Sequence, residues 1–451
     1  MNTDRNKIIT DTFKRFIRRG ATSHLKKMVN KTHPADLSLI FRSLTLADQK
    51  KLFALIKDAE QKGYLLSELD KDIFLKLIEE MSVDELVEIL ADMPSDDVAD
   101  LLADLSEEKA NEILEKMHKE DSQTVENLLS YGDDTAGGIM VPDFIALKQD
   151  ITAGDAIKVM QKDYIEVEMP FYLYVVDEYH KLVGISSLRQ LVVVPQGKKL
   201  KEFMTTDIIS VKTDMDQEEV ARIVAQYNIL AVPVTDHSNK LVGIVTVDDV
   251  IDIIRSEATE DILKMAGAGE EYVETKSVIK STKIRLPWLF ASCFGGIIAS
   301  LIIGKFGKMV SEYIHIAAFI PVIAGMGGNI GTQSSTIVVR GIATRRIDIR
   351  DFWKVVSKEL SIGFILGSFY GLIIGSIAKI KYEASFLGLA VGLAVVASMS
   401  VAALVGSVVP MLLVKFDIDP AVATGPFVTT AIDIIGIFLY LTIASLLIFG
   451  I

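Results

Sequence analysis

The chain of 451 residues is half hydrophobic, has a positive mean hydropathy and carries a formal net charge of −13. Its acidic residues lie mainly in roughly the first 270 positions, so a soluble acidic part precedes an apolar part. This charge excludes nucleic acid as a partner, because no basic face outweighs the carboxylates. The single cysteine, Cys293, excludes a disulfide framework. The charged N-terminus lacks the apolar core of a signal peptide, so we expect the acidic part to stay in the cytoplasm.

The segment from His33 to Tyr131 is predicted to be a helical solenoid. Apolar residues recur every twelve positions, at Met81, Met93, Leu105 and Met117. Each unit between them opens with Ser, Asp or Pro and continues with apolar residues at helical spacing, which is the start signal of a short helix. Such repeats bury their apolar stripes on one another. Residues 1–137 are therefore assigned to an all-α N-terminal domain.

The outer faces of these helices are acidic. Asp96 and Asp100 are separated by four residues and share one helical face. Two interpretations fit this pattern: the carboxylates are solvated surface, or the cluster of like charges repels itself and attracts a cation.

An internal repeat follows the helical domain. Two blocks of the first copy align with two blocks of the second: 140–150 with 204–214, and 174–192 with 233–251. Each copy is predicted to run strand, helix, strand, turn, strand, helix. The pattern resembles the CBS domain, which implies an α/β tandem CBS pair over 138–256, with copies at 138–200 and 201–256.

The second copy keeps a G-x-x-T-x-x-D pattern at Gly243, Thr246 and Asp249. CBS pairs often hold an adenine nucleotide, so the resemblance makes Thr246 and Asp249 candidate nucleotide ligands. The first copy has Ser187 and Gln190 at the matching places and has lost the acidic position. ATP binding is therefore left open.

Carboxylates crowd the end of the repeat and the connector helix predicted over 257–283. They are Asp248, Asp249, Asp252, Glu257, Glu260 and Asp261. The spacing of an EF-hand loop is absent, and one Cys with six scattered His disfavours zinc. Carboxylates alone suit hard cations such as Mg²⁺ or Ca²⁺.

Five membrane spans are predicted in residues 284–451. The apolar runs cover 286–303, 314–339, 360–380, 386–414 and 426–449. Lysines and arginines lie before the first run and between the second and third. They place the N-terminus in the cytoplasm and the C-terminus outside a plasma or inner membrane. The loop between the fourth and fifth runs, with Asp417 and Asp419, then faces the cytoplasm.

The fifth run carries one ionised side chain, Asp433, with Thr429 and Gly425 on the same helical face. A carboxylate at membrane depth is costly, by roughly 3 kcal/mol, and marks an ion path or a buried ion pair. No run offers a mid-span basic partner, which favours the ion path. The second run is rich in glycine and polar residues, among them Gly328, Asn329 and Thr332. Packing between helices and the lining of a pore explain it equally well.

The order of these parts, with GGNIGTQSSTIVVR in the second run and PFVTTAID in the fifth, resembles the MgtE family of magnesium channels. The resemblance implies a homodimer with a pore between subunits, built from the second and fifth spans, and makes Asp433 the pore carboxylate for hydrated Mg²⁺. It also implies regulatory Mg²⁺ ligands. These are Asp96, Asp100, Asp216, Asp249, Asp252, Glu257, Glu260, Asp261 and Asp419.

The function expected from these features is Mg²⁺ influx through a channel that cytosolic Mg²⁺ closes. The alternative is a gradient-coupled secondary transporter of another divalent cation such as Co²⁺ or Mn²⁺. A third interpretation is a nucleotide sensor with the spans as an anchor, although an anchor needs neither five spans nor Asp433. No nucleophile–base pair is found, so we expect no enzymatic activity.

Overall fold

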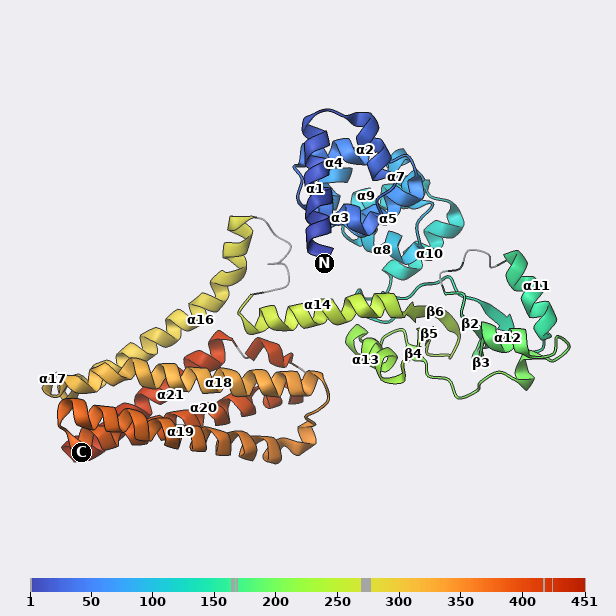
Figure 1. The fold of residues 1–451 in the computed structure, drawn as a ribbon. Coiled ribbons are helices and arrows are strands. Elements are labelled where there is room, and N and C mark those ends of the chain that lie inside the picture. The colour runs from blue at the N-terminus through green and yellow to red at the C-terminus, as the bar shows by residue number, and fades with distance from the viewer. Residues whose placement is uncertain are drawn as a thin grey trace. The chain divides into compact units, whose positions relative to one another are not determined.

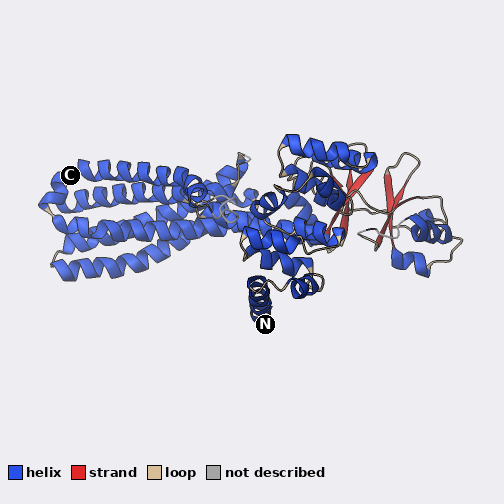
Figure 2. Cartoon of the chain, turned by 90° about the horizontal axis from the view of Figure 1, so that it is seen from above, coloured by secondary structure: helices blue, strands red, loops and turns tan. Residues whose placement is uncertain are grey.

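The computed structural model describes residues 2–163, 167, 169–268, 277–416, 418–423 and 425–450 (Figure 1). The chain divides into two units, Met1–Glu257 and Ala258–Ile451, and each is described by itself. Helices dominate both, and the strands are confined to the first (Figure 2).

The first unit begins with ten short helices, as the solenoid prediction requires. They are α1 (Asn2–Arg18), α2 (Thr22–Val29), α3 (Pro34–Arg42), α4 (Leu46–Phe53), α5 (Ala59–Ser67), α6 (Lys71–Ile78), α7 (Val83–Leu90), α8 (Ser95–Ala103), α9 (Glu107–Lys116) and α10 (Lys119–Leu129). Their starts follow capping chemistry: the hydroxyls of Thr45 and Ser82 accept hydrogen bonds from the backbone N–H groups of Asp48 and Glu85. The predicted helical N-domain is confirmed.

Helices two apart in sequence pack against each other. One row runs α3, α5, α7, α9, and a second runs α2, α4, α6, with α8 against α10. Their apolar stripes form one core, in which Leu37, Leu65 and Ile89 are buried. This arrangement leaves the acidic positions of α8 on the outside of the stack or at its edge, where another domain can face them.

The CBS pair has two three-stranded sheets of the same topology. The first copy holds β1 (Ala146–Lys148), α11 (Ala153–Asp163), β2 (Tyr172–Val176), β3 (Leu182–Ser187) and α12 (Leu188–Val193), followed by the 3₁₀ turn η1 (Leu200–Glu202). The second holds β4 (Val211–Lys212), α13 (Gln217–Tyr227), β5 (Ala231–Thr235), β6 (Leu241–Thr246) and α14 (Val247–Met265). In each sheet the first strand is parallel to the second, which is antiparallel to the third.

The two copies are tied together by an exchange of their leading segments. Val141, ahead of β1 in the first copy, bridges Ile244 of β6, and Thr205, ahead of β4 in the second, bridges Ile185 of β3. The methionine beside each bridge fills the space over a glycine: Met204 covers Gly184 and Met140 covers Gly243. Neither copy therefore completes its own sheet surface.

Among its described residues, the second unit contains five helices long and apolar enough to cross a membrane. Its elements are α16 (Val278–Lys305), α17 (Gly307–Glu312), η2 (Ile314–Phe319), α18 (Ile320–Ala343), η3 (Ile349–Asp351), α19 (Phe352–Tyr382), α20 (Ser385–Lys415), η4 (Pro420–Ala423), α21 (Pro426–Ala444) and η5 (Ser445–Phe449). Helices α18 to α21 run alongside one another (Figure 1). The predicted count of spans agrees with these helices.

Helices α19 and α20 pack with their backbones close together. Four glycines of α19 repeat every four residues, at Gly363, Gly367, Gly371 and Gly375. A Cβ on Gly375 would lie 2.6 Å from the carbonyl oxygen of Gly388 in α20, and one on Gly371 would lie 2.6 Å from that of Gly392. The glycines thus allow backbone-to-backbone packing, as small residues do in membrane helices.

The connector predicted over 257–283 corresponds to the end of α14 and the beginning of α16. The residues between them, 269–276, lie outside the described residues, as does Asp417. Helix α16 starts eight residues before the first predicted span, because its basic first turns continue the same helix as the apolar run.

Candidate functional site: a membrane carboxylate and two acidic clusters

Asp433 lies on α21 and faces α18. Proline at the first position starts α21, and Asp433 follows two turns later. A Cβ on Gly328 of α18 would lie 3.9 Å from Oδ1 of Asp433. The structure therefore brings together two of the predicted pore residues, one from each helix.

The polar face of α18 is left uncovered by its own chain. Asn329 and Thr332 are exposed, whereas Ile323, Ile330 and Ser334 on other faces are buried. Packing within one chain therefore does not account for this polar face. At membrane depth, such a face requires water or a second protein chain.

Asp433 has no basic neighbour in the described part of the second unit. Among the described residues no ion pair includes Asp433, and the two pairs of Lys264 are with Glu260 and Asp419. The Asp433 side chain is half-buried. A buried ion pair would require a basic partner for Asp433, and the described residues provide none.

Thr429 and Gly425 have local roles in the single chain. The Thr429 hydroxyl donates to the carbonyl oxygens of Gly425 and Pro426, at 3.3 and 3.2 Å. Gly425 is buried, and a Cβ there would lie 3.0 Å from the carbonyl oxygen of Met265. Its lack of a side chain thus serves a close approach of α14 to α21, which the sequence reasoning did not foresee.

Glu359 is a second membrane carboxylate, and the sequence reasoning missed it. It is 3% exposed and accepts a 2.8 Å hydrogen bond from the hydroxyl of Ser334 on α18. The third span was predicted to begin at Leu360, so Glu359 was counted as loop. Because α19 begins at Phe352, the carboxylate actually lies two turns inside the helix.

An acidic cluster forms in the first unit between α8 and the start of α14. Burial, followed by repulsion from Asp249 and Glu68, raises the pKa of Asp97 to about 6. The pKa of Asp100 rises to about 7; partial desolvation by the surrounding protein is the main cause, and repulsion from Asp97 comes next. Burial likewise raises the pKa of Asp249, although the Thr246 hydroxyl donates a 2.5 Å hydrogen bond to it. We call Asp97, Asp100 and Asp249 the upper cluster.

Two of the three residues of the upper cluster are among the predicted Mg²⁺ ligands, and the third, Asp97, is not. Asp100 and Asp249 were predicted, but Asp96 was named in place of Asp97. Asp96 lies one residue earlier in the first turn of α8, partly buried. The i,i+3 spacing of Asp97 and Asp100 also places both on one face, so this signal was available in the sequence.

The other predicted metal ligands are engaged elsewhere. Asp216 caps α13 by accepting from the Glu218 N–H, Asp252 pairs with Arg255, and Glu257 accepts from the side-chain amide of Gln217. Glu260 and Asp419 both contact Lys264, whereas Asp261 is partly buried on α14. Among the residues that the structure describes, no three His, Cys, Asp or Glu side chains are grouped closely enough to hold a metal ion.

The upper cluster and the pair of Glu260 and Asp419 differ in the charges that surround their carboxylates. In the upper cluster, burial and, after it, repulsion between carboxylates raise the pKa values of Asp97 and Asp100, and a bridging divalent cation would relieve the repulsion. At Glu260 and Asp419, an ammonium group already supplies the positive charge. The repulsion between Glu260 and Asp419 is therefore already offset by Lys264, whereas the described residues show no ion pair for Asp97, Asp100 or Asp249.

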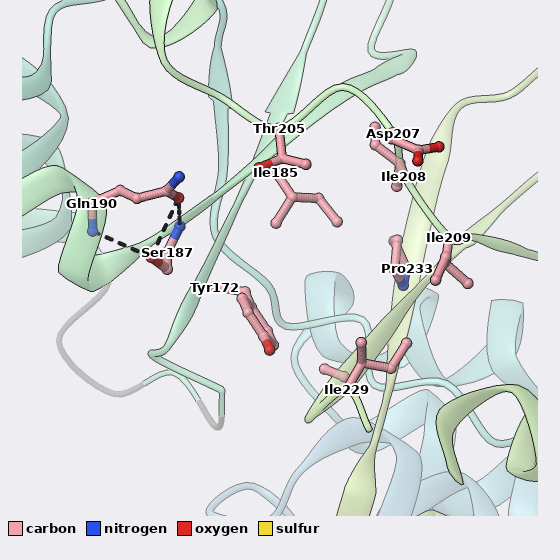
Figure 3. A pocket seen from close by; sticks show the side chains of 11 residues that line it. Tyr172, Ile185, Ser187, Gln190, Thr205, Asp207, Ile208, Ile209, Ile229 and Pro233 are labelled. Carbon is pink, nitrogen blue, oxygen red and sulfur yellow. Dashed lines mark hydrogen bonds between the residues drawn. The ribbon is translucent and has the colours of Figure 1, made fainter. Parts of the chain in front are cut away.

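A cavity of about 200 Å³ lies between the CBS copies (Figure 3). Ser187 and Gln190 of the first copy line one end, and Ile229 and Pro233 of the second copy line the other. Gln190 and Ser187 form a reciprocal helix cap, in which Oε1 of Gln190 accepts from the Ser187 N–H at 2.8 Å. The predicted nucleotide ligands Thr246 and Asp249 do not line this cavity; they bond to each other instead.

The fold and these sites define a class: a multi-pass membrane protein that joins a helical acidic domain and a CBS pair to a bundle with carboxylates inside. Family models agree with each part. A divalent cation transporter model, MgtE, matches residues 320–443, the MgtE intracellular N domain matches 32–134, and the CBS domain matches 136–196 and 200–256.

Curated relatives and solved structures identify the family. The chain is 36% identical over 331 residues to the magnesium transporter MgtE of Thermus thermophilus, and 38% identical over 327 residues to that of Enterococcus faecalis; each match covers 72% of both chains. A crystal structure of the cytosolic domain of the Mg²⁺ channel MgtE with ATP matches 54% of this chain and 99% of its own, with a TM-score of 0.51 at 31% identity. The chain belongs to the MgtE family.

Proposed function

We propose that the protein is a homodimeric channel for Mg²⁺, which cytosolic Mg²⁺ closes. The observation that carries the proposal is the position of Asp433 beside Gly328, next to a polar face of α18 that its own chain leaves uncovered. The magnesium transporters to which the chain is similar support Mg²⁺ as the ion.

In this proposal, two copies bring their α18 polar faces and Asp433 carboxylates around one water-filled path. Mg²⁺ dehydrates reluctantly and keeps several waters, so two carboxylates hold it through those waters. The site must bind the ion firmly enough to select it and weakly enough to release it. The membrane potential supplies about 4.6 kcal/mol per 100 mV for two inward charges.

Closure follows from the upper cluster. Without a cation, Asp97 and Asp100 of the N-domain repel Asp249 of the CBS pair, which favours separation of the two parts. A divalent ion between them favours the compact arrangement, because it binds that arrangement more tightly. The channel thus closes when cytosolic Mg²⁺ is plentiful. This mechanism requires the acidic part to lie in the cytoplasm, as the basic residues flanking the spans predict.

ATP is proposed as a modulator at the cavity between the CBS copies. The ATP complex of the related cytosolic domain supports a nucleotide there. In this chain, the place of the missing carboxylate is filled by Gln190, whose Oε1 already accepts from Ser187. We therefore expect weaker ribose recognition than an acidic residue provides.

Patch recording and Mg²⁺ uptake in liposomes that contain the purified full chain test the pore. Asp433→Ala is expected to reduce both to background, because no other carboxylate described in the membrane helices lies beside the α18 polar face. Glu312→Gln, an exposed carboxylate of α17, is the matched control and keeps parental uptake. Parental currents in Asp433→Ala dimers would reject the proposed pore.

A gradient-coupled transporter of another divalent cation, such as Co²⁺ or Mn²⁺, is the second candidate. Glu359 favours it, because a carboxylate buried inside a membrane helix bundle is costly and typically marks a substrate or ion pathway. Uptake that persists with neither a Na⁺ nor a pH gradient supports the channel. Uptake that stops when the gradient collapses supports the carrier.

A further inference from the structure

Lys264 joins two carboxylates from distant parts of the second unit. Its ammonium nitrogen lies 2.6 Å from Glu260 on the same helix and 2.7 Å from Asp419, which follows α20. The side chains of Lys264, Glu260 and Asp419 are 27%, 29% and 35% exposed, so water screens them only in part. The second carboxylate oxygen of Asp419 accepts from the Ala421 N–H at 2.8 Å and thereby fixes the turn η4.

The ammonium group is stably charged in this position. Burial alone would lower the pKa of Lys264, but its hydrogen bonds to Asp419 and Glu260 and their negative charges hold the pKa above its ordinary value. The positive charge therefore persists across the physiological pH range. Two carboxylates that would otherwise repel each other are bridged by a cation that belongs to the chain.

The ion pairs lie where α14 meets the start of α21. The carbonyl oxygen of Met265, the residue after Lys264, is close enough to Gly425 that only glycine fits there without displacement. Gly267, in a left-handed conformation at φ +71°, packs against the ring of Pro426. The same helix α21 carries Asp433 two turns further on.

We propose that Lys264 is a tethered cation that replaces a bound metal ion between Glu260 and Asp419. The family resemblance assigns both carboxylates to regulatory Mg²⁺, whereas the contacts assign them to the lysine. The end of α14 is thus held on α21 without Mg²⁺. This inference rests on the proposed gating in one respect: it leaves the upper cluster as the place where Mg²⁺ controls closure.

Removal of the ammonium converts the junction into a metal site. In Lys264→Met the two carboxylates face each other without a cation, and a divalent ion entering between them restores the balance of charge. The parent protein gains nothing from such an ion, because the lysine competes for the same oxygens.

The test counts bound Mn²⁺, a paramagnetic substitute for Mg²⁺, on the purified full-length protein by electron paramagnetic resonance. Lys264→Met is expected to bind one more Mn²⁺ per chain than the parent, and the gain is lost in Lys264→Met/Asp419→Asn. Lys264→Arg keeps the parental count, because it keeps the charge. Lys119→Met, which removes an exposed lysine at the start of α10, is the control and also keeps the parental count.

Two results would overturn the inference. One is a parental count that falls by one in Asp419→Asn, which would mean that a metal already occupies the junction. The other is an unchanged count in Lys264→Met protein that still shows the parental melting transition. Both are independent of ion conduction, so failure of Mg²⁺ to close the parent channel would reject the proposed function without affecting this count.

Discussion

The two CBS copies have the same sheet topology and the same capping position, yet they present different charges. Their antiparallel strand pairs even share a register shift at the same place, after Val175 in one and Val234 in the other. At the start of the last helix, Ser187 pairs with Gln190 in the first copy and Thr246 pairs with Asp249 in the second. Gln190 and Asp249 each bond to the residue three positions earlier, but only Asp249 adds a charge that faces Asp97 and Asp100.

The fold of a CBS copy therefore depends little on whether glutamine or aspartate stands at this position. The choice between glutamine and aspartate is therefore available for function. In this chain the first copy borders the cavity with a neutral residue, and the second opposes the N-domain with an ionisable one. Substitution of Gln190 by aspartate, or of Asp249 by glutamine, would show whether the charge at each position matters apart from its hydrogen bond at the helix start.

The largest effect is expected from Asp249→Gln, which gives the second copy the capping residue of the first. The helix cap is kept, but the cation loses its ligand on the CBS side of the upper cluster. The Mg²⁺ concentration for half-maximal channel closure should rise roughly tenfold or more, equivalent to the loss of about 1.4 kcal/mol or more in binding. Patch recording at varied cytosolic-side Mg²⁺ measures it.

Gln190→Asp, which gives the first copy the capping residue of the second, is the reciprocal control in that assay. This change adds a carboxylate outside the upper cluster, so its closure curve should match the parent. A parental closure curve for Asp249→Gln would contradict the role of the upper cluster.

A smaller effect is expected from pH. The pKa values of about 6 for Asp97 and about 7 for Asp100 exceed the ordinary aspartate value, so the compact arrangement binds more protons than the separated one. Its stability is therefore fully present below about pH 4 and is lost progressively as pH rises to about 7. Without Mg²⁺, tryptic cleavage between the N-domain and the CBS pair should be roughly threefold slower at pH 6 than at pH 8, after correction for trypsin activity.

The pH effect should disappear when the upper cluster is neutralised. Asp97→Asn/Asp100→Asn protein is expected to show the same corrected cleavage rate at both pH values. Faster cleavage of the parent at pH 6 would have the wrong sign for carboxylates with raised pKa values.

The smallest effect is expected from Gln190→Asp on nucleotide binding. A carboxylate at this position accepts hydrogen bonds from ribose hydroxyls more strongly than an amide oxygen that already accepts from Ser187. ATP affinity of the full chain should increase a few-fold in isothermal titration calorimetry, consistent with a hydrogen bond worth roughly 1 kcal/mol. An unchanged affinity would place the ribose away from Gln190.

The sequence predicted the elements better than the contacts between them. Twelve-residue periodicity, the internal repeat and the apolar runs each have a local signal, and the solenoid, the CBS pair and the five apolar helices follow from them. The pairing of Asp97 with Asp249 depends on how α8 faces α14, which no local pattern records. Lys264 was not singled out from the sequence, because its partner Asp419 is 155 positions away.

Glu359 was missed for a different reason. A hydropathy boundary ends where the first charge appears, whereas a helix continues for as long as its backbone hydrogen bonds do. Helix α19 starts at Phe352, eight residues before the predicted start of the span at Leu360. Glu359, a charged residue of the helix interior, was therefore assigned to a loop. The same reasoning applies to the early start of α16.

The glycine contacts between α19 and α20 have a mechanical consequence. Two helices whose backbones touch at Gly371, Gly375, Gly388 and Gly392 have no intervening side chains whose rotation could let them slide. We therefore expect α19 and α20 to keep their positions relative to each other and to move as a single rigid body. Displacements that open or shut an ion path then belong to α16, α18 and α21, and spin labels on α19 and α20 should keep their mutual distance while labels on α21 shift.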